Sequence, residues 1–466
     1  MITKIELDGF KTFQDFELEL SPFQVIVGPN GVGKSNLFDA LRLLSQLADN
    51  DLRSAFGCLR GEAGELFTTI SDGQAVSCMR LAVEILVEPT VTDSWGAKAD
   101  IKFPRLRYEL EISRRSNEHG LERLYVTRES LEPIRRNDDR WFKRHMSTAV
   151  EAWQRPLKAG RSTAFISTEE APNRGLSTIH LHRDGRGSRK ASPAEKVERT
   201  VLSGVTGSEF PHAFAAREEM RSWAFLHLNP GALRQPGSML ATSEVSPDGS
   251  NLPSALARMQ AEDPLLLKDV ERDLANLVPG VIGVEVNKDL ARDRYVIQVK
   301  TQDGRTFSAR VLSDGTLRLL ALATLRNDPQ RHGVLCLEEP ENGLHPFRIE
   351  NMAQLLQGLA TDFSDPDQGH EPLRQLLVNT HSPLLVSQPG VVKNVLFAYS
   401  STRIQPRQGR MPMRVTRIVP VKPYSQPKSN LNTDDPEAVY THDQVVSYLS
   451  SADTGAALSF LQAAVG

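Results

Sequence analysis

The sequence predicts an α/β protein with a mixed central sheet, an antiparallel β subdomain and an inserted, mainly helical or irregular arm. The first observation is the order strand, glycine-rich turn, helix over residues 23–48, where leucines at helical spacing follow the glycines. The second is the alternation of apolar and polar residues between 76 and 126, which is typical of antiparallel strands with one solvated face. The third is a pair of later apolar runs, 334–337 and 373–378, which both end in polar residues.

Composition places the 466 residues among soluble globular proteins, because 39% of them are apolar and 24% are charged. The net charge of −3 identifies no partner, so any nucleic-acid surface has to be local. Three cysteines without metal-ligand spacing argue against a disulfide framework and for a reducing compartment. No stretch reaches the ~20 apolar residues of a membrane helix, and the start lacks a signal-peptide core. We therefore expect a cytoplasmic protein without a membrane partner.

Shifts in composition divide the chain into four segments. We expect residues 1–126 and 253–400 to form two halves of one unit, with an inserted segment at 127–252 and a tail at 401–466. Arginine enriches the insertion, where sixteen Lys or Arg stand against ten Asp or Glu between 128 and 199. The stretch from Lys393 to Lys428 holds eight Lys or Arg and no acid. Neither group of basic residues forms a continuous stripe. An ordinary solvated surface and a nucleic-acid-binding surface therefore both remain possible interpretations.

The later half of the chain also shows regular patterns. Residues 253–278 are predicted to be helical, and residues 281–311 are predicted to form strands separated by a polar turn.

The most specific motif is Gly28-Pro-Asn-Gly-Val-Gly-Lys-Ser35, which fits the pattern G-x-x-x-x-G-K-[ST] in full. Glycines let the backbone wrap closely, so that successive N–H groups point at phosphate oxygens at a helix N-terminus. Lys34 is expected to reach the β- and γ-phosphates, and the Ser35 hydroxyl is expected to ligate Mg²⁺. A chance match is a poor alternative, because an apolar strand and a leucine-striped helix flank the glycines.

A second element is the apolar run from Val334, which ends in the paired acids Glu338 and Glu339. A buried parallel strand delivers such carboxylates to the carboxyl edge of the sheet, where α/β proteins bind ligands. One carboxylate near Mg²⁺ and one that polarises water suit in-line attack on a γ-phosphate. Acids are common at strand ends, so this interpretation depends on the glycine loop.

Two further elements are less specific. The segment Leu312-Ser-Asp-Gly-Thr-Leu317 opens an apolar helix, in which Ser313 or Asp314 caps the first turn and Gly315 exposes backbone N–H groups. An ordinary helix cap explains the same residues. The segment Thr380-His-Ser-Pro383 ends another apolar strand, and a lone histidine there is more often structural.

Together and in this order, the four elements resemble the head domain of the ABC ATPase superfamily. The resemblance is to the soluble branch that contains structural-maintenance-of-chromosomes (SMC) proteins, RecF and the overcoming-lysogenization-defect ATPases. GPNGVGKS matches the Walker A motif, LSDGT the ABC signature, LEEPENGLHP the Walker B and D-loop region, and THSP the histidine switch. The opening LDGFKTF resembles the first strand of that branch. The resemblance covers residues 1–90 and 280–400, and the intervening length suits a head interrupted by an arm.

The resemblance implies a role for each matching residue. Glu338 takes the Mg²⁺-associated Walker B place, Glu339 is the catalytic base or water-orienting acid, and His381 senses the γ-phosphate. ATP lies between two heads of a homodimer or higher homo-oligomer, where Ser313 and Gly315 contact the γ-phosphate bound to the opposite subunit. Within one head, the expected nucleotide contacts are Lys11, Asn30, Gly31, Gly33, Lys34, Ser35 and Asn36, of which Lys34 is also counted as catalytic.

Two residues depart from the family pattern. Glu338 stands where most members have aspartate, which lengthens the side chain next to the metal. His345 stands at the D-loop place where many members carry aspartate. The Q-loop glutamine is not placed by the sequence, and Gln74 is a weak candidate.

The resemblance further implies an ATP hydrolase of a prokaryotic anti-phage system. We expect a subunit that senses foreign DNA or a phage protein and controls an effector in a separate chain, because no acidic cluster after His381 resembles a Toprim nuclease. Two alternatives stay open. One is a RecF-like DNA repair factor that binds DNA in an ATP-dependent way, and the other is a scaffold that binds ATP with negligible hydrolysis.

Overall fold

The computed structural model describes residues 1–70, 74–116, 121–146, 163–170, 177–183, 190–194, 198–242, 244–403, 413–422 and 440–450. Much of the arginine-rich insertion and most of the tail therefore lie outside the described residues, including the greater part of the basic stretch after residue 403. Within the described ranges, no helix combines the length and the apolar character needed to cross a bilayer.

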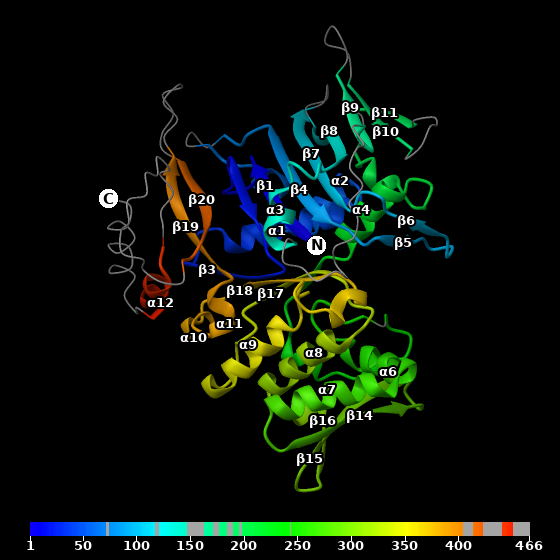
Figure 1. The fold of residues 1–466 in the computed structure, drawn as a ribbon, viewed down its shortest axis with the longest axis vertical. Helices are drawn as coiled ribbons and strands as arrows, with labels where there is room; N and C mark the ends of the chain where they lie inside the picture. The colour runs from blue at the N-terminus through cyan, green and yellow to red at the C-terminus, as the bar shows by residue number, and fades with distance from the viewer. Residues whose placement is uncertain are drawn as a thin grey trace.

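A six-stranded sheet crosses the middle of the molecule and draws its strands from distant parts of the chain (Figure 1). The order is β12-β17-β18-β3-β19-β20, in which the first five strands are parallel and β20 is antiparallel to β19. This confirms the predicted mixed central sheet. The bounds are Ala224–Leu226 for β12, Gly333–Glu338 for β17, Arg374–Asn379 for β18, Phe23–Val27 for β3, Val395–Arg403 for β19 and Met413–Pro420 for β20.

Alternate side chains of the central strands enter two different hydrophobic cores. On β18, Leu377 packs in the core that contains α1 (Lys34–Leu47), whereas Val378 packs in the core that contains α8 (Asp314–Asn327) and α9 (Ile349–Gln357). Side chains two apart on a strand point to the same face. Each strand therefore has one face toward α1 and one face toward α8.

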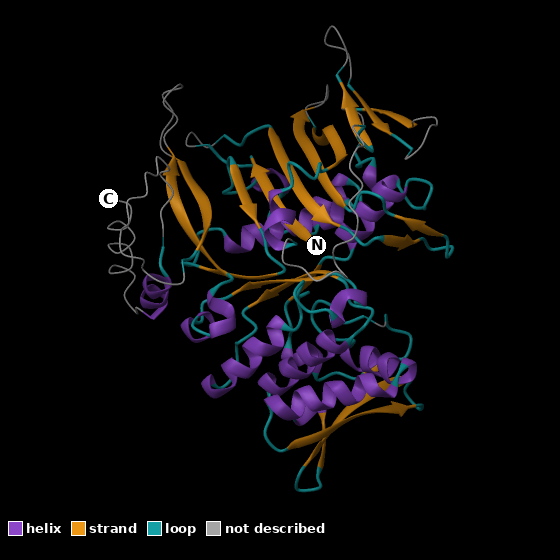
Figure 2. Ribbon diagram, in the orientation of Figure 1, coloured by secondary structure: helices purple, strands orange, loops and turns teal. Residues whose placement is uncertain are grey.

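An eight-stranded antiparallel sheet adds its apolar face to the core of α1 (Figure 2). Its order is β11-β10-β9-β8-β7-β4-β1-β2, which confirms the predicted antiparallel β subdomain. The bounds are Ile2–Asp8 for β1, Phe16–Glu19 for β2, Cys78–Leu86 for β4, Arg105–Ser116 for β7, Glu122–Pro133 for β8, Ile166–Glu169 for β9, Thr178–Leu181 for β10 and Lys190–Pro193 for β11.

The segment expected to form a mainly helical or irregular arm, residues 127–252, holds helices such as α3 (Arg140–His145) and α5 (Pro230–Leu233) and irregular stretches where it is described, and it also contributes strands that the sequence did not predict. It supplies most of β8 and all of β9, β10 and β11 to the antiparallel sheet, and β12 to the edge of the central sheet. Helix α4 (Pro211–Arg221) packs in the core of α1. The strands were hidden in the sequence because they are short and contain many polar residues. The division of the chain at residues 126, 252 and 400 stays a prediction.

A buried carboxylate joins the antiparallel sheet to the segment before α4. Glu129 of β8 accepts hydrogen bonds from the backbone N–H groups of Val201 at 2.6 Å and Leu202 at 2.8 Å. The hydroxyl of Tyr108 donates to the same carboxylate at 3.1 Å. Burial raises the pKa of Glu129 to about 7.

The helices and strands predicted for 253–311 are confirmed. Helix α6 (Leu252–Glu262) is followed by α7 (Pro264–Leu277), and the break falls at Asp263, whose side chain accepts the N–H of Leu265. Pro264 suits the first helical position because it has no N–H to satisfy. The strands β14 (Val281–Asp289), β15 (Arg294–Thr301) and β16 (Thr306–Ser308) form a small sheet with β13 (Gly237–Ser238).

Candidate functional site

The glycine loop connects β3 to α1 and needs glycine where other groups approach the backbone. Gly33 has φ 102°, and a Cβ at this position would lie 2.2 Å from Thr416 Oγ1 and 2.7 Å from Thr12 Oγ1. Gly31 has φ 77° and open space around the place of a Cβ. The loop is therefore packed tightly on one side and leaves room for a ligand on the other.

Residues far apart in the sequence hold the packed side of the loop. The Thr416 hydroxyl of β20 donates to the carbonyl oxygen of Val32 at 2.6 Å, and it lies 2.6 Å from Thr12 Oγ1. The side-chain amide of Asn36 donates to Thr12 Oγ1 at 3.0 Å. The two threonines were not predicted: Thr12 lies in the quoted LDGFKTF segment but was given no role there, and no motif includes Thr416.

Lys34 begins α1 and folds back onto the loop. Its Nζ donates to the carbonyl oxygens of Gly28 at 2.8 Å and Pro29 at 2.6 Å. Burial lowers the pKa of the ammonium group to about 8, and the nearby Glu339 carboxylate opposes this shift. Among the described residues, no side chain caps the start of the helix. The first N–H groups of α1 are thus available to an anion.

A cavity of about 370 Å³ opens between the loop and the carboxyl edge of the central sheet. It brings together most of the residues that the sequence predicted for the site. The predicted residues that line it are Asn30, Gly31, Gly33, Lys34, Ser35, Asn36, Glu338, Glu339 and His381.

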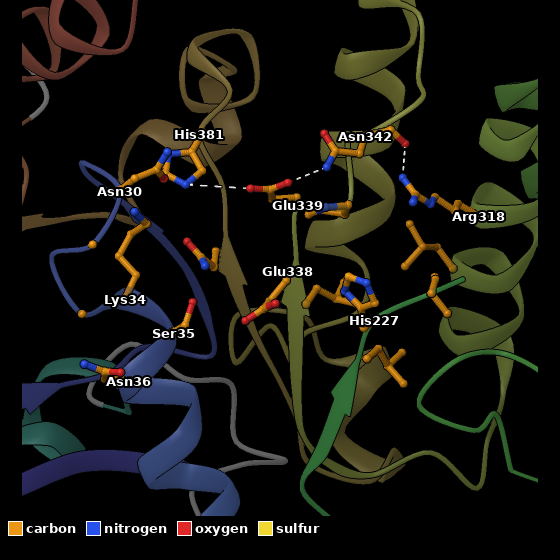
Figure 3. A pocket seen from close by; sticks show the side chains of 18 residues that line it. Asn30, Lys34, Ser35, Asn36, His227, Arg318, Glu338, Glu339, Asn342 and His381 are labelled. Carbon is orange, nitrogen blue, oxygen red and sulfur yellow. Dashed lines mark hydrogen bonds and ion pairs between the residues drawn. The ribbon is translucent and has the colours of Figure 1, made fainter. Parts of the chain in front are cut away.

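The carboxylate of Glu338 lies opposite Ser35 across the cavity (Figure 3). Cys336, two residues earlier on β17, packs in the core of α1, so Glu338 points toward the same layer. The exposed Arg60 guanidinium is 4.0 Å from Glu338 Oε2, the limit of an ion pair. The carboxylate is therefore directed at the helix that carries Ser35.

Glu339 follows β17 in a left-handed backbone conformation, with φ 47°. Its N–H donates to the carbonyl oxygen of Asn379 at 2.8 Å, which fixes the turn. The Asn342 amide donates to Oε2, and His381 Nε2 lies 3.8 Å from Oε1 (Figure 3). Burial and the positive charge of Lys34 lower the pKa of His381. The imidazole is consequently neutral near pH 7.

Lys11 lies outside this group. It has φ 46° in the turn after β1, and its Nζ pairs with Asp39 Oδ2 of α1 at 2.7 Å. It is not among the residues that line the cavity. Its contact with a nucleotide stays a prediction.

The signature segment also lies outside the cavity. Ser313 caps α8 by accepting the N–H of Thr316, and it is exposed. Gly315 is buried, and a Cβ at this position would lie 2.8 Å from the carbonyl oxygen of Gly343. We expected Gly315 to expose its backbone, but it packs against the loop that follows β17. Arg234 donates to Asp314 and to the carbonyl oxygen of Leu312.

Sequence reasoning missed four polar residues that line the cavity. Asn342 stood inside the quoted LEEPENGLHP segment and Arg318 directly after the signature segment, and Arg318 donates to the carbonyl oxygen of Asn342. His227 follows the edge strand β12, and Asn379 ends β18, so both reach the site only through strand pairing. Gln74, the weak Q-loop candidate, does not line the cavity.

The chemistry of the residues that line the cavity suits a nucleoside triphosphate and a hard cation. Free helix N–H groups and the Lys34 ammonium group suit phosphate oxygens. Ser35 and Glu338 offer the oxygen ligands that Mg²⁺ prefers. The buried Oδ1 of Asn379 has no hydrogen-bond partner among the described residues, which is consistent with a group completed by a ligand.

The chain is similar to one protein family and to parts of known proteins. A family model described as "AAA domain, putative AbiEii toxin, Type IV TA system" matches residues 23–387, more than half of the chain. The chain is 34% identical over 112 residues to the chromosome partition protein Smc of Thauera aminoaromatica, and 31% identical over 111 residues to that of Bordetella petrii. Each match covers 22% of this chain and only 9% of the Smc protein.

The chain also aligns with the solved structure of an Smc head bound to the C-winged helix domain of ScpA. It is 15% identical, with a TM-score of 0.47, over 90% of this chain and 97% of the head.

The glycine loop, the paired acids and the histidine meet at one edge of a parallel sheet, and the family model spans all of them. The chain therefore belongs to this AAA-domain family.

Proposed function

We propose that the chain binds ATP with Mg²⁺ in this cavity and hydrolyses it between two heads. The observation that carries the proposal is the meeting of Lys34, Ser35, Glu338, Glu339 and His381 around one cavity while Ser313 stays outside it, exposed. One head thus offers a phosphate site and a water-activating carboxylate, but not the signature contact. A second copy of the chain supplies that contact.

Each residue has a role that follows from its surroundings. The α1 N–H groups and Lys34 bind phosphate oxygens, and Ser35 and Glu338 hold the cation. Bound Mg²⁺ neutralises charge on the phosphate oxygens. Glu339 orients the attacking water and accepts its proton, and the Asn342 amide fixes the direction of its carboxylate. The neutral imidazole of His381 donates a hydrogen bond toward the γ-phosphate.

Mixing two inactive variants tests the two-headed site. Lys34→Ala removes the phosphate lysine, and Ser313→Arg places a bulky charge where the second head would dock. Each variant alone should be inactive. A mixed dimer contains one composite site with an intact Lys34 from one chain and an intact Ser313 from the other, so the mixture should regain ATP hydrolysis. A mixture that stays inactive while both variants still form mixed dimers would contradict the composite site.

A scaffold with negligible hydrolysis is the second candidate, and the longer Glu338 in place of aspartate favours it. Quenched-flow measurement of ADP formation decides between the two. Hydrolysis requires wild-type turnover that Glu339→Gln abolishes, whereas the scaffold requires equally low rates in both proteins.

We also propose that the head serves as the ATPase subunit of an anti-phage system and controls a separate effector. The family description names a toxin–antitoxin system, an arrangement of two components, and this agrees with an ATPase that acts through another protein. Foreign DNA or a phage protein is the proposed trigger. Phage plating on cells that carry the gene with its native neighbours tests the role. Lys34→Ala should abolish protection, and equal protection by wild type and variant would exclude an ATP-dependent role.

A further inference from the structure

The amide of Asn379 is a buried polar group at the edge of the cavity. The residue is 6% exposed, it lines the cavity, and its Oδ1 has no hydrogen-bond partner among the described residues. An amide oxygen that is buried without a partner costs free energy. Such a group in a ligand site therefore indicates a partner that arrives with the ligand.

The strand register fixes the direction of Asn379. Leu377, two residues earlier on β18, packs in the core of α1, so Asn379 faces the layer in which α1 begins. In the parallel pairing of β17 with β18, Asn379 is the partner of Glu338. The register therefore places the amide beside Glu338, whose carboxylate faces Ser35.

The neighbours select the chemistry of the missing partner. Mg²⁺ usually keeps several water molecules when one or two protein oxygens bind it. These waters donate hydrogen bonds, and outer-shell acceptors orient them.

We propose that Asn379 is a positioning residue of the cation site, whose Oδ1 accepts a hydrogen bond from a water molecule on the Mg²⁺ held by Ser35 and Glu338. This inference rests on the proposed ATP site and deepens it, because it adds an outer-shell residue from the strand next to Glu338.

Binding of a fluorescent ATP analogue, titrated with Mg²⁺ and repeated in EDTA, tests the role without hydrolysis. Asn379→Leu keeps a similar volume and removes the acceptor. The half-saturating Mg²⁺ concentration should rise by about tenfold or more, the usual effect of losing an outer-shell partner. Affinity in EDTA should stay close to that of the wild type. Asn379→Asp keeps an acceptor oxygen and should leave the half-saturating Mg²⁺ concentration at or below the wild-type value.

Two results would overturn the role. One is the same Mg²⁺ dependence in Asn379→Leu and wild type, and the other is an Asn379→Asp variant as impaired as Asn379→Leu. Asn287→Leu on β14, outside the cavity, is the control and should match the wild type. If thermal unfolding shows that Asn379→Leu does not fold, Asn379→Asp decides alone, and a weaker Mg²⁺ response than wild type overturns the role. Wild-type protein that binds the analogue in neither condition would instead refute the proposed ATP site itself, together with this inference.

Discussion

His381 Nε2 lies 3.8 Å from Oε1 of Glu339, and the Asn342 amide holds the other oxygen of the same carboxylate. The Asn342 amide therefore orients the carboxylate before any substrate binds, whereas the neutral His381 ring lies beside it without a hydrogen bond. Such preorganisation is what a water-activating group needs, because the geometry does not have to be found during the reaction.

Replacing the carboxylate by an amide should separate binding from hydrolysis. We expect Glu339→Gln to lower ATP turnover by about 10²–10⁴-fold, the usual contribution of a general base. ATP binding should persist, because the phosphate contacts come from the glycine loop. The variant should then accumulate as an ATP-bound dimer, which light scattering coupled to size exclusion can measure. Glu350→Gln, at the exposed start of α9, is the matched control. A monomeric Glu339→Gln protein at saturating ATP would argue against the two-headed site.

Lys34 predicts how ATP affinity depends on pH. Its pKa of about 8 in the free protein reflects burial, and phosphate binding requires the charged form. The affinity for ATP should therefore be highest below pH 8, where Lys34 is charged. It should fall as the pH rises through 8, by up to about tenfold per pH unit. Lys34→Arg stays charged throughout this range and should show a flat profile, even if its affinity is lower overall. Calorimetric titrations between pH 7 and 9.5 measure both slopes, and parallel slopes would exclude Lys34 as the titrating group.

Much of the site was predictable because its chemistry is local in sequence. A phosphate loop needs glycines, a lysine and a hydroxyl in one continuous stretch before a helix, and residues 28–35 hold them all. The paired acids at 338 and 339 were recognisable because an apolar run placed them at a strand end. Fold class followed from the same patterns.

The rest of the site depends on strand pairing that no local pattern reveals. Asn379 and His227 reach the cavity because β18 and β12 both lie beside β17. Thr416 supports the loop from β20, which is close to Gly33 only in the folded chain. The strands β9, β10 and β11 of the insertion were missed for a different reason. They pair with their neighbours in sequence, but each has only four residues and little alternation of apolar and polar side chains.

Gly315 predicts a specific packing defect. A Cβ there would meet the carbonyl oxygen of Gly343 and the Leu344 side chain at 2.8 Å, so Gly315→Ala forces the loop after β17 to move. Overpacking of this kind costs about 1–3 kcal/mol of stability. Hydrolysis should also fall, because the same loop carries Asn342. Thermal unfolding and ATP turnover measure the two effects. Gly57→Ala at the end of α2 (Leu52–Gly57), where nothing lies within 4 Å, should change neither.

Glu129 predicts that stability falls as the pH rises toward 8. Burial raises its pKa to about 7, so between the unfolded value of about 4.5 and this value the folded state binds more protons than the unfolded state. The contribution of Glu129 to the free energy of unfolding is therefore fully present below pH 4.5. It is lost as the pH rises through 7, and the loss is up to about 3 kcal/mol.

The difference between wild type and Glu129→Gln isolates this effect, because the other titrating groups are present in both proteins. The pKa of Glu6 is lowered to about 2 by the Arg107 guanidinium, so Glu6 changes the pH dependence of stability only at more acidic pH. Urea denaturation at several pH values between 5 and 8 should show that the wild type loses stability relative to Glu129→Gln as the pH rises. Curves that stay parallel across this range would mean that Glu129 keeps one protonation state, and its bonds to Val201 and Leu202 would then contribute equally at every pH.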